Sequence, residues 1–136
     1  AMPANVTLLP FIHSSHELAR ILASADGFVH AGDQETFGLV LIEAMACGRG
    51  VVAANAGAMP EIVTPDVGVL VAPGDPHALA EGVRAFYAKD PAALGNCARA
   101  RVEQDYTWSA TMRGLLELYR GALVAGGVRT TGYAIS

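Results

Sequence analysis

The sequence predicts an α/β fold in which a parallel sheet carries helices on both faces. Short, almost continuously apolar runs alternate with segments whose apolar residues recur at helical spacing, as expected of strands joined by helices. Strands that are apolar along their whole length are typical of a parallel sheet buried on both sides. The chain has 136 residues, of which 52% are hydrophobic, and this is enough for one compact domain.

The first predicted elements are a strand and a helix. Residues 6–12 form a short apolar run that predicts a buried strand, although Pro10 cannot donate a backbone hydrogen bond in its second half. Ser14 and Glu17 have the spacing of a capping box, which satisfies free amides at a helix start. The apolar spacing that follows predicts a helix ending at Asp26-Gly27.

Three further strands and one helix are predicted in the middle of the chain. A strand is expected at 28–31, followed by a polar loop and a helix at roughly 38–47 that Gly48 would end. Apolar runs at 51–54 and 67–72 predict the third and fourth strands. Together with the helices, these strands predict a Rossmann-like sheet.

The last third of the chain is predicted to be helical. Asp75-Pro76 and Asp90-Pro91 both combine an N-cap residue with a proline at the first helical position. Thr107 or Ser109 would cap a final helix. We expect one domain over 1–125 and a flexible tail over 126–136.

The composition argues against several kinds of partner. The net charge is −4 and no basic run occurs, which argues against nucleic-acid binding. No run approaches the ~18 apolar residues that span a membrane. Cys47 and Cys97 lack metal-ligand spacing, so we expect two buried thiols in a reducing cytoplasm. His13 and His16 have no third metal ligand at a suitable spacing.

Two glutamates make residues 35–48 the most informative segment. Glu35 and Glu43 are eight residues apart, across the point where the loop becomes a helix. Such a helix start has unpaired backbone N–H groups and the positive end of the helix dipole, and the N–H groups can donate hydrogen bonds to a phosphate. Carboxylates accept hydrogen bonds from the hydroxyl groups of a sugar. The glutamate pair beside this helix start therefore predicts a site for a phosphorylated sugar. The alternative is that both glutamates are solvated and have no role in binding, because the helix dipole by itself favours acidic residues at a helix start.

The run from Ala25 to Glu61 resembles the carboxyl-terminal half of a retaining GT-B glycosyltransferase of family 4. The residues that carry the resemblance are Glu35, the Phe37-Gly38 pair, and Glu43 at the start of Glu-Ala-Met-Ala-Cys-Gly. Later segments are also similar to the family, so that the likeness extends over about residues 5–124. They are Gly57–Val63, Asp66–Val71, Pro73–Pro76 and Asp105–Trp108.

The resemblance implies a role for each residue of this segment. Glu43 would hold the ribose of a nucleoside diphosphate, and Glu35 would contact hydroxyls of the donor sugar as the residue nearest the chemistry. The amides of Phe37, Gly38 and Leu39 would meet the diphosphate and the sugar. The family uses no metal in this site, so the nucleotide sugar is a substrate and no cofactor is expected.

Four other residues have two possible roles each. His30 ends a strand facing the expected cleft and would be either a donor-site hydrogen-bond partner or an ordinary strand-end histidine. Glu61 would contact the nucleotide or cap the turn after proline. Trp108 and Tyr106 are expected to pack in the core and hinge rather than stack on a base. The apolar stripe of the last helix would be core or a docking face.

The resemblance also implies that part of the enzyme is absent from this sequence. The acceptor-binding amino-terminal domain is missing, and so is the basic pair that neutralises the diphosphate. Two strands are also missing, and in the family's sheet they lie between the first and the second of the strands predicted here. We therefore expect a partial GT-B C-terminal domain that is inactive alone, with an exposed sheet edge available for homo-oligomers. The parent enzyme would be cytoplasmic or peripheral to the membrane. The alternatives are a non-catalytic nucleotide-binding or docking module and part of a GT-B nucleotide-sugar epimerase.

Overall fold

The computed structural model describes residues 3–125 and contains one parallel three-stranded sheet among six helices within that range. The strands are hydrogen-bonded in the order β1-β2-β3. The elements in chain order are α1 (Ser15–Ser24), β1 (Gly27–His30), α2 (Leu39–Ala46), β2 (Gly50–Ala54), α3 (Met59–Ile62), β3 (Gly68–Val71), α4 (Pro76–Ala88), α5 (Pro91–Asp105) and α6 (Trp108–Ala125).

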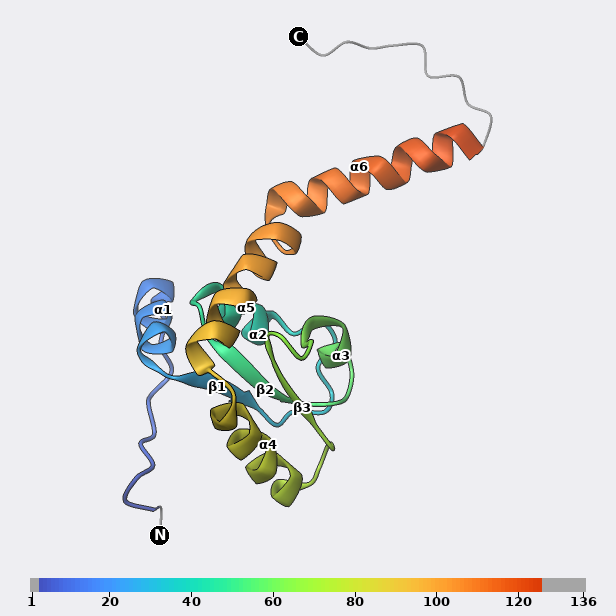
Figure 1. Cartoon of the computed structure of the whole chain (residues 1–136). Helices are drawn as coiled ribbons and strands as arrows, with labels where there is room; N and C mark the ends of the chain where they lie inside the picture. The colour runs from blue at the N-terminus through green and yellow to red at the C-terminus, as the bar shows by residue number, and fades with distance from the viewer. Residues whose placement is uncertain (1–2, 126–136) are drawn as a thin grey trace.

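The central strand β2 is buried along its whole length because helices cover both of its faces. Val51 and Ala53 point into a core shared with α2, α3 and α5, whereas Val52 packs with Phe86 of α4 on the other side. Figure 1 shows α4 on one side of the sheet and α1 and α2 on the other. The prediction of a Rossmann-like α/β sheet covered on both faces is therefore confirmed.

Local capping chemistry determines where four of the helices start. Ser14 accepts a hydrogen bond from the N–H of Glu17 at 3.3 Å, as the capping-box spacing predicted. Asp75 and Asp90 each accept two amide hydrogen bonds from the first turn of α4 and α5. Thr107, not Ser109, caps α6 through its hydroxyl, which accepts from the N–H of Ala110 at 3.2 Å.

The predicted strand at 6–12 is wrong. No strand occurs between residues 3 and 14, and side chains such as Leu8 and Phe11 are exposed. Within residues 3–13 the backbone makes a local hydrogen bond, from the N–H of Val6 to the carbonyl of Pro3. A strand forms only against a partner that pairs its amides and carbonyls, and no neighbouring strand in residues 3–125 is available to this segment.

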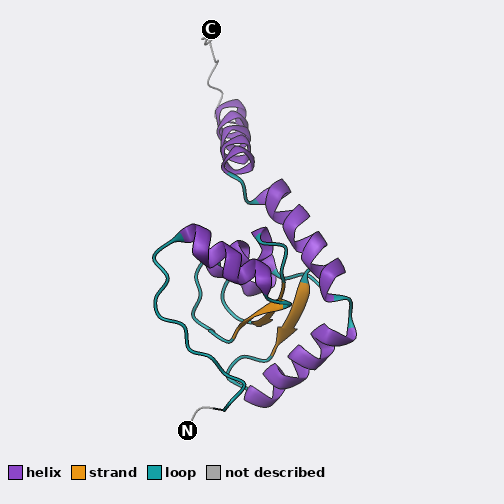
Figure 2. Cartoon of the chain, turned by 90° about the vertical axis from the view of Figure 1, so that its left-hand side faces the viewer, coloured by secondary structure: helices purple, strands orange, loops and turns teal. Residues whose placement is uncertain are grey.

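The last helix leaves the body of the domain. Figures 1 and 2 show α6 extending away from the sheet, and none of its residues is buried. Its apolar stripe is therefore not core within the described residues. The predicted packing of Trp108 is wrong, because the side chain is 80% exposed, whereas Tyr106 packs against the core as expected. The predicted tail at 126–136 lies outside the described residues.

Among residues 3–125, β1 forms a free edge of the sheet, because it pairs with β2 on one side only. Val29 is in register with the buried Val52, yet it remains 46% exposed because α4 packs over β2 and β3. No helix within residues 3–125 is long and apolar enough to cross a membrane.

Candidate functional site

The start of α2 is built around Gly38. This residue has a φ of +79°, a left-handed conformation that glycine adopts without strain. Its N–H donates to the Glu35 carboxylate, with 3.3 Å between the nitrogen and Oε1. The Glu35 side chain thus caps the helix that carries Glu43, and its negative charge lies at the positive end of the helix dipole.

The two faces of α2 have different roles. Leu41, Ile42, Ala44 and Met45 are buried in the core. The exposed residues Leu39, Glu43 and Ala46 follow one another at spacings of four and three, so they form a single stripe along the helix. Two predicted donor-site residues, Leu39 and Glu43, therefore share the face of α2 that a ligand could reach.

Glu35 lines an open cavity of about 290 Å³ together with Phe37 and Glu61. The cavity lies between the Glu35 loop, α3 and the corner before α6, where Tyr106 forms part of its wall. The structure thus brings together three of the residues predicted from sequence. Two carboxylates and two aromatic side chains give this cavity the means to bind a polyhydroxylated ligand.

Glu43 lines a different hollow, of about 230 Å³, between α1 and α2. Leu18 and Leu22 of α1 form its apolar wall, and Cys47 lies at the end of α2. Glu35 and Glu43 therefore border two separate hollows. Their separation follows from the placement of α1 and α3, which the spacing of the glutamates did not predict. The prediction of two buried thiols is wrong, because Cys47 is half-buried and Cys97 is exposed.

His30 is the last residue of β1, as predicted, at the carboxyl edge of the sheet. Its Nε2 atom is buried and has no hydrogen-bond partner among residues 3–125. Gly32 lies close against the Nε2 end of the ring, because a Cβ added there would be 2.8 Å from Nε2. The histidine is therefore covered by its own loop in this structure, and the proposed contact with a donor remains a prediction.

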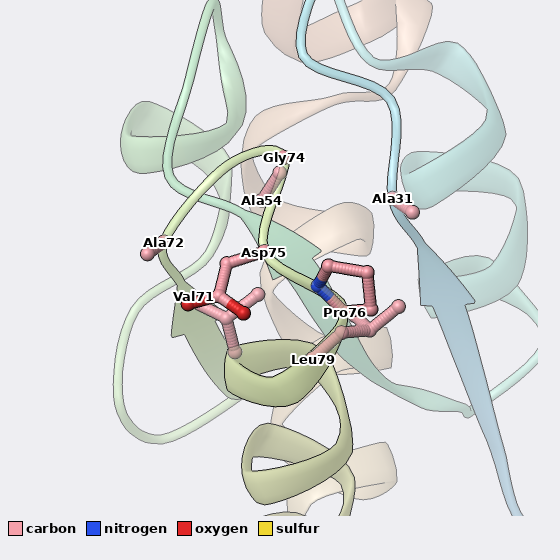
Figure 3. A pocket seen from close by; sticks show the side chains of 8 residues that line it. All are labelled: Ala31, Ala54, Val71, Ala72, Gly74, Asp75, Pro76 and Leu79. Carbon is pink, nitrogen blue, oxygen red and sulfur yellow. The ribbon is translucent and has the colours of Figure 1, made fainter.

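A third cavity, of about 190 Å³, lies at the carboxyl ends of the strands (Figure 3). Ala31, Ala54 and Val71 line it from the three strand ends, with Leu79 of α4. Its acidic side chain, Asp75, already accepts hydrogen bonds from the N–H groups of the first turn of α4. We therefore assign this cavity no role in binding a polar ligand.

Two arginines that could have bound a phosphate are engaged in structural contacts. Arg49 donates to the carbonyl of Ala25 at 2.7 Å and to that of Cys47 at 3.2 Å, at the far end of α2. Arg101 donates to the hydroxyl of Thr64 at 2.6 Å. Arg49 thus joins the ends of α1 and α2 and lies away from the Glu35 loop.

Asp66, in the turn between α3 and β3, has a lowered pKa. A hydrogen bond from the Thr64 side chain lowers the pKa of Asp66 below its ordinary value of 3.8, assisted by a backbone N–H and by the charges of Arg101 and Lys89.

No group of three or more His, Cys, Asp or Glu side chains that could hold a metal occurs within the described range.

The fold and the site define an α/β domain of the Rossmann-like class, in which the start of a helix carries a glutamate-lined cavity. Proteins of this class bind phosphorylated ligands at helix starts beside the carboxyl ends of parallel strands. Residues 2–101 match the family of glycosyl transferases group 1. The chain belongs to this family.

Relatives with known names agree with that assignment. The chain is 38% identical over 106 residues to a GDP-mannose-dependent alpha-(1-6)-phosphatidylinositol dimannoside mannosyltransferase of Mycobacterium tuberculosis, covering 78% of this chain and 27% of the relative. Among solved structures, sucrose-phosphate synthase from Thermosynechococcus elongatus has a TM-score of 0.66 at 36% identity, covering 81% of this chain and 29% of that one. Anabaena HepE in complex with UDP has a TM-score of 0.64 at 30% identity, covering 75% and 29%. The chain therefore spans less than a third of the length of these relatives.

Proposed function

We propose that this chain is the donor-binding part of a retaining family 4 glycosyltransferase. The enzyme would transfer a hexose from a nucleotide-diphosphate sugar to a saccharide or lipid-linked acceptor, in the cytoplasm or at a membrane surface. One observation carries the proposal: the carboxylate of Glu35 lies in an open cavity and accepts a hydrogen bond from the N–H of Gly38 at the start of α2.

The proposed donor would lie across the start of α2. Its sugar would occupy the cavity of Glu35 and Glu61, where carboxylates accept hydrogen bonds from hydroxyls. Its ribose would lie in the hollow beside Glu43, between α1 and α2. The diphosphate would then come close to the amide of Leu39, where the helix dipole supplies about half a positive charge.

Phosphate binding by Gly38 would require a local change. Its amide is already hydrogen-bonded to Glu35 at 3.3 Å, which is long for a bond to a charged acceptor; such bonds are typically about 2.7–2.9 Å. A phosphate oxygen is a competing acceptor for the same amide. Release of Glu35 from Gly38 would free the Glu35 carboxylate to bind the sugar. Binding of the phosphate to Gly38 and binding of the sugar to Glu35 would therefore favour each other.

We propose that the chain does not transfer sugar by itself. A departing diphosphate needs positive charge placed where its own charge develops. Of the basic side chains described here, Arg49 and Arg101 make the structural contacts given above. The missing cation would come from the rest of the enzyme, and the free edge of β1 and the exposed residues 6–11 are surfaces to which that part could bind.

A reconstitution experiment tests the proposal. The 136-residue chain is mixed with a separately produced amino-terminal half of a full-length relative, and transfer of radiolabelled hexose is measured. The expected result is transfer by the mixture and none by either part, with loss of transfer in the Glu35→Gln mixture. Transfer by the chain alone would contradict the proposed division of labour. Nucleotide binding without transfer in any mixture would favour the non-catalytic module.

A further inference from the structure

Gly57 lies against the backbone of Glu35. The residue has a φ of +54°, and a Cβ added to it would be 2.2 Å from the carbonyl oxygen of Glu35. This is far inside van der Waals contact, and the neighbour is backbone, which cannot rotate away as a side chain could. The N–H of Ala58 donates to the same oxygen at 3.2 Å. The turn before α3 therefore fixes the backbone of Glu35.

The other end of the Glu35 loop rests on α3 as well. A Cβ added to Gly38 would be 2.6 Å from Cδ1 of Ile62 and 2.9 Å from Cε of Met59. Both of these α3 side chains are buried in the main core. The loop from Glu35 to Gly38 thus contacts the turn before α3 at one end and α3 itself at the other. Its glutamate side chain accepts a hydrogen bond from the N–H of Gly38.

The segment that supports the loop is itself held by α5. Arg101 donates from Nη2 to the carbonyl of Glu61 at 3.1 Å and from Nη1 to the hydroxyl of Thr64 at 2.6 Å. These bonds tie the carboxyl end of α3 to α5. A continuous set of contacts therefore runs from the core through α3 to the backbone of Glu35.

We propose that Gly57 is a positioning residue for the donor site. It acts through Glu35: only a residue without a side chain allows the turn before α3 to approach the Glu35 carbonyl, and this approach sets the direction of the Glu35 carboxylate. The proposal rests on the proposed function for its consequence in donor binding. Its structural part, the coupling of residue 57 to the Glu35–Gly38 hydrogen bond, stands independently.

The test compares Gly57→Ala with two matched controls in the 136-residue chain. Gly48 and Gly74 also have positive φ, of +74° and +70°, but a Cβ at either would meet nothing within 4 Å. Alanine therefore imposes a similar backbone strain at all three positions, and only position 57 adds a collision with Glu35. Gly48→Ala and Gly74→Ala separate strain from positioning.

Three quantities are measured for each variant: the urea midpoint of unfolding, amide hydrogen exchange at Gly38 and Ala58, and the Kd for UDP and GDP. We expect lowered midpoints in all three variants. We expect exchange at least tenfold faster at both amides, and nucleotide binding at least tenfold weaker, in Gly57→Ala alone. Exchange rates and Kd values equal to those of the controls would overturn the proposal.

A second variant disturbs the same contact from the neighbouring residue. Ala58→Pro removes the N–H that bonds the Glu35 carbonyl and directs the ring Cδ at the same oxygen, while the φ of −79° at this position suits proline. The same increase in exchange at Gly38 is expected, and unchanged exchange would overturn the positioning role. If the wild-type chain binds neither nucleotide, the proposed function fails, whereas the exchange comparison still decides the coupling.

Discussion

The carboxylate of Glu35 accepts a hydrogen bond from the N–H of Gly38 at 3.3 Å. The first acid of the pair therefore caps the helix on which the second acid, Glu43, lies in the exposed stripe. This bond links the fold to the proposed chemistry, because one side chain both starts α2 and lines the cavity beside it.

Glu35→Gln separates these two roles. Glutamine keeps the shape and can still accept from Gly38, so the loss is that of a charge near a helix start, about 0.3–1 kcal/mol. Nucleotide-sugar binding should weaken at least tenfold, since a neutral amide accepts hydroxyl hydrogen bonds less strongly. Urea unfolding and titration with UDP-hexose and GDP-hexose measure the two effects. Glu117→Gln removes the same charge on α6 and serves as the control; equal affinities for both variants would contradict a role in binding.

Arg49→Ala should lower the stability of the domain. The side chain donates to the carbonyls of Ala25 and Cys47, joining the ends of α1 and α2. Hydrogen bonds that involve a charged group contribute about 1.5–3 kcal/mol, so we expect a loss of this order in the free energy of unfolding. The control is Arg84→Ala, which removes an exposed pair with Glu81 and should cost at most about 1 kcal/mol. A loss no larger than that of the control would show that the two carbonyl contacts do not stabilise the domain.

Asp66 should make stability depend on pH in the acid range. Its pKa is held below 3.8 in the folded state, first by the Thr64 hydrogen bond. The folded state then binds fewer protons than the unfolded state, so this stabilisation is complete above the ordinary pKa and is lost as pH falls through the lowered one. Urea unfolding between about pH 5 and pH 2 should show a flatter decline in Asp66→Asn. The difference should be small because the side chain is exposed to solvent, and a steeper decline in the variant would contradict the sign.

Removal of residues 1–10 should leave the stability of the domain nearly unchanged. The described part of this segment forms no strand, and Leu8 and Leu9 are exposed. The urea midpoint should therefore match that of the full chain within about 0.5 kcal/mol, the range typical of surface changes. Light scattering on both forms provides the second readout. A large loss of stability, or a dimer that becomes a monomer on removal, would mean that this segment pairs with the β1 edge of another copy.

Local chemistry explains which parts of the fold the sequence could predict. Asp75 and Asp90 cap their helices as predicted because an N-cap bond joins residues two or three apart. The strand at 6–12 could not be judged in this way, since a strand depends on a partner elsewhere. The predicted packing of Trp108 was wrong for the same reason. Its burial depends on what α6 packs against, and no element among the described residues covers it.

The candidate site shows the same division. The position of Glu35 ahead of a helix start could be predicted from the Phe37-Gly38 pair. The separate hollows of Glu35 and Glu43 could not, because α1 and α3 form their walls. The contact of Gly57 with Glu35 was also missed. A glycine in the loop between β2 and α3 was the available signal, but its partner is distant in sequence and only the fold brings the two together.

Calorimetric titration of the wild-type chain and Glu43→Ala with UDP, GDP and ADP tests the central claim most directly. A matched variant, Glu103→Ala, removes a glutamate from the exposed surface of α5. The account predicts that one nucleotide binds the wild type and Glu103→Ala equally, and binds Glu43→Ala at least tenfold more weakly. Equal binding of that nucleotide by all three proteins, or binding of none, would contradict it.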